Sequence, residues 1–97
     1  MNSTVELLLP PDYNEAMNEN RECAYNVEVR VDGKLYVVHF YTVGRLDYEL
    51  KVDTREGHPW FADHGAIIVE AVNIPSMRAA VEGLAAQGYF EDLIPKR

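Results

Sequence analysis

The chain has 97 residues, 47% of them hydrophobic, which is enough for one domain with a single core but too few for two. Acidic residues outnumber basic ones by 16 to 9, and the resulting net charge of -7 disfavours direct binding to nucleic acid or anionic lipid. The single cysteine, Cys23, excludes an internal disulfide, and no apolar run approaches the ~20 residues of a membrane helix. We therefore expect one cytoplasmic domain over residues 1–97, with no membrane partner.

The first two expected elements are short. Residues 4–9 alternate only in part before Pro10-Pro11 ends the pattern, which fits either an edge strand or an apolar arm. Asp12, followed three residues later by Glu15, has the spacing of a helix capping box. This spacing predicts a short helix over residues 13–20.

The clearest pattern is a β-hairpin at residues 24–42. Asp32-Gly33 is typical of a two-residue type I′ turn, and it sets a register in which Tyr25 faces Phe40. One face of the hairpin is then entirely apolar or aromatic and should belong to the core; it carries Tyr25, Val27, Val29, Tyr36, Val38 and Phe40. The opposite, mixed face combines polar and apolar side chains; it carries Asn26, Glu28, Arg30, Leu35, Val37, His39 and Tyr41.

Two more strands are expected after the hairpin. Residues 43–45 have the composition of a turn, and residues 46–53 alternate regularly between apolar and charged or polar positions, which predicts a half-buried third strand. Its inward positions are Leu46, Tyr48, Leu50 and Val52. Residues 54–65 show no periodicity and predict one long loop. The apolar run at residues 66–72 predicts a fourth strand.

The last element is a helix that starts at the N-cap Asn73 and ends before Gly88. Apolar residues recur at helical spacing and should cover the apolar hairpin face; they are Met77, Ala80, Val81, Leu84 and Ala85. Ala79, Gly83 and Ala86 form a small-residue ridge beside them. Because glycine in mid-helix is unfavourable, the ridge predicts a close approach by the N-terminal helix or arm, or by a partner.

Together these elements predict an α+β fold. We expect a mainly antiparallel four- to five-stranded sheet with the C-terminal helix packed on one face and a short N-terminal helix near it.

Catalytic motifs are absent from the sequence. It contains no nucleophile elbow, no glycine-rich phosphate loop and no H-E-x-x-H, so we expect no catalytic residue and no cofactor. His58, Asp63 and His64 in the long loop are candidate metal ligands, but their spacing matches no zinc motif. His39 is expected to be a half-buried histidine with satisfied hydrogen bonds, rather than the acid-base partner of Glu28.

The mixed hairpin face is more apolar than a solvent-exposed face needs to be, so either the N-terminal helix or a partner should cover it. Trp60 and Phe61 either close one end of the core or anchor a partner. The candidate binding residues are Glu28, Arg30, Val37, His39, Tyr41, Trp60 and Phe61.

These residues favour a non-catalytic binding or regulatory protein that acts through an acidic surface on a protein partner or in a homodimer. The alternative is a small-ligand or metal-binding protein, or a minor enzyme, that uses His39 and Tyr41 or the loop from His58 to His64.

One resemblance to known proteins is confined to the last strand and helix. It is carried by Gly65-Ala66-Ile67-Ile68-Val69-Glu70-Ala71-Val72-Asn73-Ile74-Pro75-Ser76, by Ala80-Val81-Glu82-Gly83-Leu84 and by Gly88-Tyr89-Phe90. These segments resemble the C-terminal strand-helix unit of small uncharacterised bacterial α+β proteins, and some immunity proteins of contact-dependent toxin systems are similar there. Immunity proteins are acidic, cytosolic and non-enzymatic, so the resemblance implies a binding role without assigning an inhibitory residue.

Overall fold

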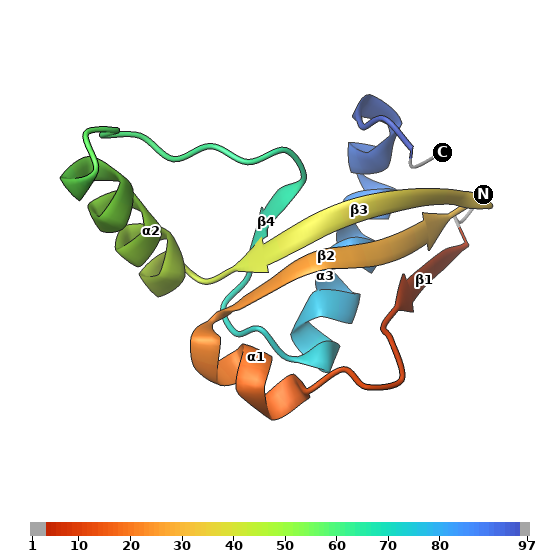
Figure 1. Ribbon diagram of the computed structural model, residues 1–97. Helices are drawn as coiled ribbons and strands as arrows, with labels where there is room; N and C mark the ends of the chain where they lie inside the picture. Colours follow the sequence, from red (N-terminus) through yellow and green to blue (C-terminus); the bar gives the residue numbers. More distant parts are fainter. Residues whose placement is uncertain (1–3, 96–97) are drawn as a thin grey trace.

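The computed structural model describes residues 4–95 and shows an α+β fold, in which this part of the chain forms one four-stranded sheet and three α-helices (Figure 1). The elements are β1 (Val5–Leu8), α1 (Glu15–Arg21), β2 (Cys23–Val31), β3 (Lys34–Tyr41), α2 (Val43–Arg55), β4 (Ala66–Ile68), α3 (Ile74–Ala86) and the 3-10 helix η1 (Tyr89–Asp92). The strands follow the order β1-β2-β3-β4. The α+β fold and its C-terminal helix are confirmed. The sheet is mixed: β1–β2 and β2–β3 pair antiparallel, as expected, but β4 pairs with β3 in parallel.

The predicted hairpin is present, with one irregularity. Asp32 (φ 50°) and Gly33 (φ 82°) adopt the left-handed conformation that a type I′ turn requires, and the pairing from Val31 to Val27 has the predicted register. Between Ala24 and Val27 a β-bulge shifts the register, and Asn26 has a φ of 55°. Ala24 therefore pairs with Phe40 in place of Tyr25. The prediction that Tyr25 lies in the core is wrong, since its side chain reaches the mixed face and is 47% exposed.

The predicted third strand at residues 46–53 is wrong, because this segment belongs to the helix α2. Thr42 caps the helix by accepting a hydrogen bond from the Arg45 N–H at 3.1 Å. Two ion pairs at helical spacing, Arg45–Glu49 and Asp47–Lys51, lie along its surface. The connection from β3 to β4 thus contains a helix, which is the usual crossover between parallel neighbours.

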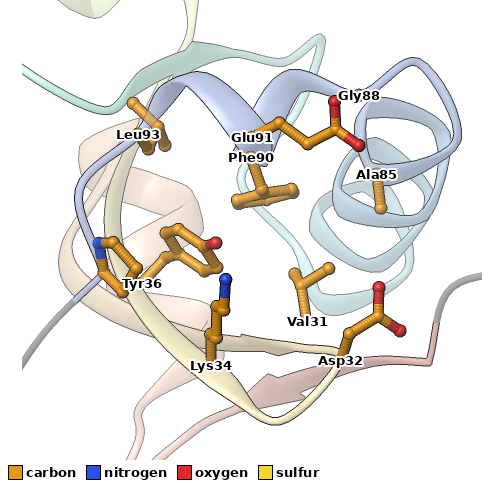
Figure 2. Close-up of a pocket in the computed structure, with 10 residues that line it drawn as sticks. Val31, Asp32, Lys34, Tyr36, Ala85, Gly88, Phe90, Glu91 and Leu93 are labelled. Atoms are coloured by element: carbon orange, nitrogen blue, oxygen red, sulfur yellow. The ribbon is translucent and has the colours of Figure 1, made fainter.

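The core lies between the sheet and α3. Met77 and Val81 of α3 are completely buried against Val29 and Val38 of the hairpin. Beyond α3, Gly88 adopts a φ of 78° and turns the chain so that the buried Phe90 packs on Tyr36, with 5.2 Å between ring centroids (Figure 2). The apolar hairpin face is covered in this way.

The N-terminal helix α1 lies against the start of α3. A carboxylate oxygen of Glu15 accepts a hydrogen bond from the Ile74 N–H at 2.6 Å, and Glu19 accepts one from the Asn73 side chain at 3.0 Å. Asn14 caps α1 in place of the predicted Asp12. Because α1 packs beside α3, it does not supply the cover that was considered for the mixed face (Figure 1).

The small-residue ridge of α3 faces solvent. Ala79, Gly83 and Ala86 are exposed, and a Cβ built on Gly83 would meet nothing within 4 Å. The expected close approach of an N-terminal segment is therefore wrong.

Helix α2 stands apart from the rest of the molecule (Figure 1). None of its residues is buried. The radius of gyration is 14.0 Å, whereas a compact domain of this length has about 12.5 Å. Among residues 4–95, no helix is long and apolar enough to cross a lipid bilayer.

Candidate functional site

Four rings gather on the mixed face near the end of β3. Tyr25 contacts Tyr41 and His39, with 5.7 and 6.2 Å between ring centroids, and Phe61 from the α2–β4 loop lies edge-on to Tyr41 at 5.6 Å. The bulge in β2 places Tyr25 in this cluster, and only 1% of the Tyr41 residue surface is exposed. The mixed face is thus covered at this end by the chain's own loop.

Asp63 fastens that loop to the sheet. Its Oδ2 accepts a hydrogen bond from the Tyr41 hydroxyl at 2.6 Å, and its Oδ1 lies 3.9 Å from Nε2 of His39. The other ring nitrogen of His39, Nδ1, accepts a hydrogen bond from the Asn26 N–H at 2.9 Å. In the neutral ring the proton must then be on Nε2, which faces Asp63. His39 therefore binds the bulge through Nδ1 and places Nε2 beside Asp63.

The two tyrosines are poor candidates for acid-base chemistry near neutral pH. Burial, together with the hydrogen bond to Asp63 and the charge of that carboxylate, raises the pKa of Tyr41 above its ordinary value of 10.0. Burial is also the largest of the effects that raise the pKa of Tyr25 to about 12. Both hydroxyls stay protonated and act as hydrogen-bond donors.

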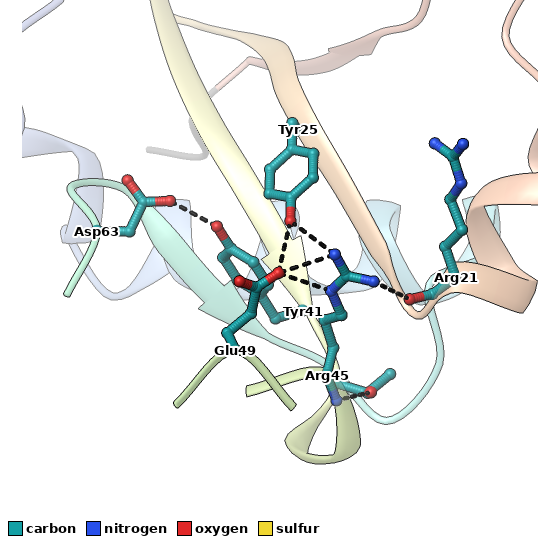
Figure 3. Close-up of polar contacts among 7 residues, drawn as sticks. Arg21, Tyr25, Tyr41, Arg45, Glu49 and Asp63 are labelled. Carbon is teal, nitrogen blue, oxygen red and sulfur yellow. Dashed lines mark hydrogen bonds and ion pairs between the residues drawn. The ribbon is translucent and has the colours of Figure 1, made fainter. Parts of the chain in front are cut away.

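Arg45 joins α2 to the sheet and to α1 (Figure 3). Its guanidinium donates to Glu49 Oε1 from Nε at 2.9 Å and lies 2.8 Å from the same oxygen through Nη2. It also donates to the Tyr25 hydroxyl at 3.3 Å and to the backbone carbonyl of Arg21 at 3.4 Å. Tyr25 in turn donates to Glu49 at 3.1 Å. These contacts involve Arg45 and Glu49, whereas the neighbouring residues Leu46 and Leu50 form a wall.

That wall borders an apolar groove of about 560 Å³. The groove runs between α2, the following loop and β4, and it is lined by Leu46, Leu50, Trp60, Phe61, Ala62, Asp63, Ala66 and Ile68. Trp60 is 61% exposed, Ile68 46% and Leu50 41%. Exposed apolar side chains gathered at one concave site are typical of binding surfaces. This groove is the candidate functional site.

The residues predicted to bind do not all meet at the groove. Trp60 and Phe61 line it, while His39 and Tyr41 hold Asp63, which also lines it. Glu28, Arg30 and Val37 lie farther along the hairpin: Glu28 pairs with Val37 and with Leu8 in the sheet, and Arg30 forms an ion pair with Glu6 at 3.6 Å.

The loop histidines form no evident metal centre. Within the described part of the chain, no three His, Cys, Asp or Glu side chains are grouped so that they could hold a metal ion, so His58, Asp63 and His64 do not converge. Asp63 is directed to Tyr41 and His39 instead.

Sequence reasoning missed the groove residues on α2, Leu46 and Leu50, because it placed them on a strand. The spacing of Arg45 with Glu49 and of Asp47 with Lys51 was the available signal, since opposite charges four residues apart stabilise a helix. Ile68 was recognised only as part of an apolar run.

A second hollow, of about 370 Å³, lies near the hairpin turn (Figure 2). Lys34, Asp32 and Glu91 border it together with core residues such as Phe90. Because it combines charges of both signs in a small space, it favours no single class of ligand as clearly as the groove does.

Comparison of the chain with protein-family models, with curated proteins and with solved structures found no match.

Proposed function

We propose that this chain is a non-catalytic binding protein and that the groove between α2 and β4 receives an apolar segment of a protein partner. The observation that carries the proposal is the exposure of Trp60, Leu50 and Ile68 around one concave apolar site. Large aromatic residues in such sites dominate the energetics of protein-protein interfaces.

The charge distribution supports a basic partner. Segment 43–70 carries six carboxylates against three cationic side chains. The acidic residues are Asp47, Glu49, Asp53, Glu56, Asp63 and Glu70. Two of the cations, Arg45 and Lys51, are already paired with Glu49 and Asp47. A positively charged partner would be attracted to this region and would associate faster.

A binding role also agrees with the resemblance of segment 65–76 to immunity proteins, which act by binding. The beginning of that segment, β4, forms one wall of the groove.

Affinity capture with matched variants tests the proposal. The immobilised chain is offered a lysate of its source cell, and retained proteins are identified by mass spectrometry and quantified. Trp60→Ala should weaken capture of the partner by about tenfold or more, because it truncates the most exposed aromatic residue of the groove. Ile94→Ala, which truncates a residue that is 88% exposed and does not line the groove, should leave capture unchanged.

A partner that the Trp60→Ala variant retains fully, or one that is lost equally with Ile94→Ala, would contradict binding at the groove. Circular dichroism of both variants shows whether the fold is kept.

A further inference from the structure

The outer edge of β4 carries backbone groups that no strand pairs. In the parallel ladder, Gly65 accepts from the His39 N–H at 3.0 Å and Val69 donates to the Tyr41 carbonyl at 2.8 Å. The pairing of Phe40 with Ile67 completes this ladder, so β4 uses residues 65, 67 and 69 to bond β3. The N–H and C=O groups of Ala66 and Ile68 consequently point to the opposite edge of β4.

That edge is the end of the sheet. The strand order places β4 last, and the described residues supply no further strand beside it. An unpaired edge with outward N–H and C=O groups is a template for another extended chain. The edge thus offers the backbone of Ala66 and Ile68 for pairing.

The edge and the apolar groove belong to one surface. Side chains alternate along a strand, so Ala66 and Ile68 point to one face while the buried Ile67 points to the other. Ala66 and Ile68 line the groove, together with Trp60 and with Leu50 of α2. A strand added beside β4 would lie about 4.8 Å away and would direct every second side chain to this same face. Backbone pairing and side-chain burial can therefore occur together.

The excess of carboxylates around the groove favours an added strand of positive charge. The carboxylates of segment 43–70 outnumber its cations, as described above, and Asp63 lies in the groove itself. A strand with apolar residues on the groove side and a net positive charge fits this field, whereas an acidic strand would be repelled.

We propose that the partner segment binds by strand addition: an extended, basic stretch of a second protein, with alternating apolar residues, becomes the fifth strand of the sheet at the open edge of β4. This inference rests on the proposed function, because it specifies how the groove is used and by which class of segment. Backbone bonds would supply affinity, and the groove would select the alternate side chains.

The test uses peptides recovered from a display library of random sequences about ten residues long, the upper length of a natural strand. Peptides selected on the full chain are synthesised with a fluorescent label, and their affinity is measured by anisotropy. Each peptide is also made in two N-methylated forms, which block alternate sets of its backbone N–H groups. Strand addition predicts that one form loses about tenfold or more in affinity while the other changes by less than about twofold, since only one set faces β4.

Variants of Ile68 provide the matching test on the protein. Ile68→Pro removes the outward N–H and leaves the bonds to β3 intact, because proline is tolerated on an edge strand where its nitrogen faces solvent. Ile68→Ala truncates the side chain and keeps the N–H. We expect Ile68→Pro to weaken binding about fivefold or more beyond Ile68→Ala. Amide NMR spectra of both variants check that the β3–β4 pairing is preserved.

Each remaining outcome has a distinct meaning. Peptides that depend on Trp60 but lose affinity equally in both methylated forms would overturn strand addition and leave the proposed function standing. Selected peptides with a net negative charge would overturn the charge assignment. Self-association of the chain that Ile68→Pro abolishes, measured by sedimentation equilibrium, would replace the basic partner with a second copy. A library that yields no peptide dependent on Trp60 would contradict the proposed function and this inference with it.

Discussion

Replacing Gly65 with alanine should be one of the most damaging conservative changes in this chain. Gly65 immediately precedes β4 and has a φ of 78°, a conformation that costs a residue with a Cβ about 1 to 2 kcal/mol. The added Cβ would also lie 2.9 Å from the carbonyl oxygen of Val37, which is fixed in the central strand β3. Relieving such a contact requires backbone movement, which typically costs about 1 to 3 kcal/mol more.

The expected loss is therefore about 2 to 5 kcal/mol, which corresponds to a fall in Tm of roughly 8 to 40 °C for a domain of this size. Gly57→Ala is the matched control, because Gly57 has a φ of 92° and a Cβ built there would meet nothing within 4 Å. Gly57→Ala should show the conformational cost alone, about 1 to 2 kcal/mol.

Urea unfolding followed by far-UV circular dichroism measures both losses, and an unchanged m-value shows that the same surface is exposed in each variant. Equal losses for Gly65→Ala and Gly57→Ala would refute the reasoning, because they would show that the close approach of Gly65 to Val37 has no energetic consequence.

Two further predictions concern Gly83 of α3 and Tyr41, which donates a hydrogen bond to Asp63 of the α2–β4 loop. Gly83→Ala should raise the free energy of unfolding by up to about 1 kcal/mol, because Gly83 is exposed in mid-helix and its added Cβ would meet nothing within 4 Å. A lower free energy of unfolding in urea would contradict this prediction. For Tyr41, the pKa in the folded chain is raised above the ordinary 10.0, so above about pH 10 the unfolded chain binds fewer protons than the folded one. The associated stability is complete below pH 10.0 and is lost as pH rises through the folded pKa. Tyr41→Phe should consequently flatten the decline in stability measured between about pH 9 and about pH 11, and an unchanged slope would contradict the contribution of this phenol.

The hairpin and the C-terminal helix could be predicted because their local signals agree with their burial. Asp32-Gly33 specifies its turn, and the Asn73 cap precedes a helix whose apolar positions, such as Met77 and Val81, enter the core. Where a face is buried, the periodicity of the sequence records it.

The same argument explains why α2 was mistaken for a strand. Periodicity reports burial, and α2 buries no residue, so Leu46, Tyr48, Leu50 and Val52 were free to follow an alternating pattern. The error then affected the sheet: a strand was expected between β3 and β4, whereas the α2 crossover makes these two strands parallel neighbours.

The candidate site could be predicted from the sequence only in part, for a related reason. Trp60, Phe61, His39 and Tyr41 were predicted as binding residues. Their arrangement depends on Asp63, whose hydrogen bond to Tyr41 joins positions 22 residues apart. The β-bulge at Asn26, which brings Tyr25 to the same face, interrupts an alternation that the sequence otherwise maintains. Neither feature has a local sequence signal.

The separation of α2 from the core affects the order in which parts of the molecule unfold. A helix of 13 residues is marginally stable by itself, and this one is held mainly by the polar contacts of Arg45 and the cap at Thr42. The core between the sheet and α3 does not depend on those contacts. Helix α2 can therefore unfold while the rest stays folded, and the wall of the groove made by Leu46 and Leu50 would form or disappear with it.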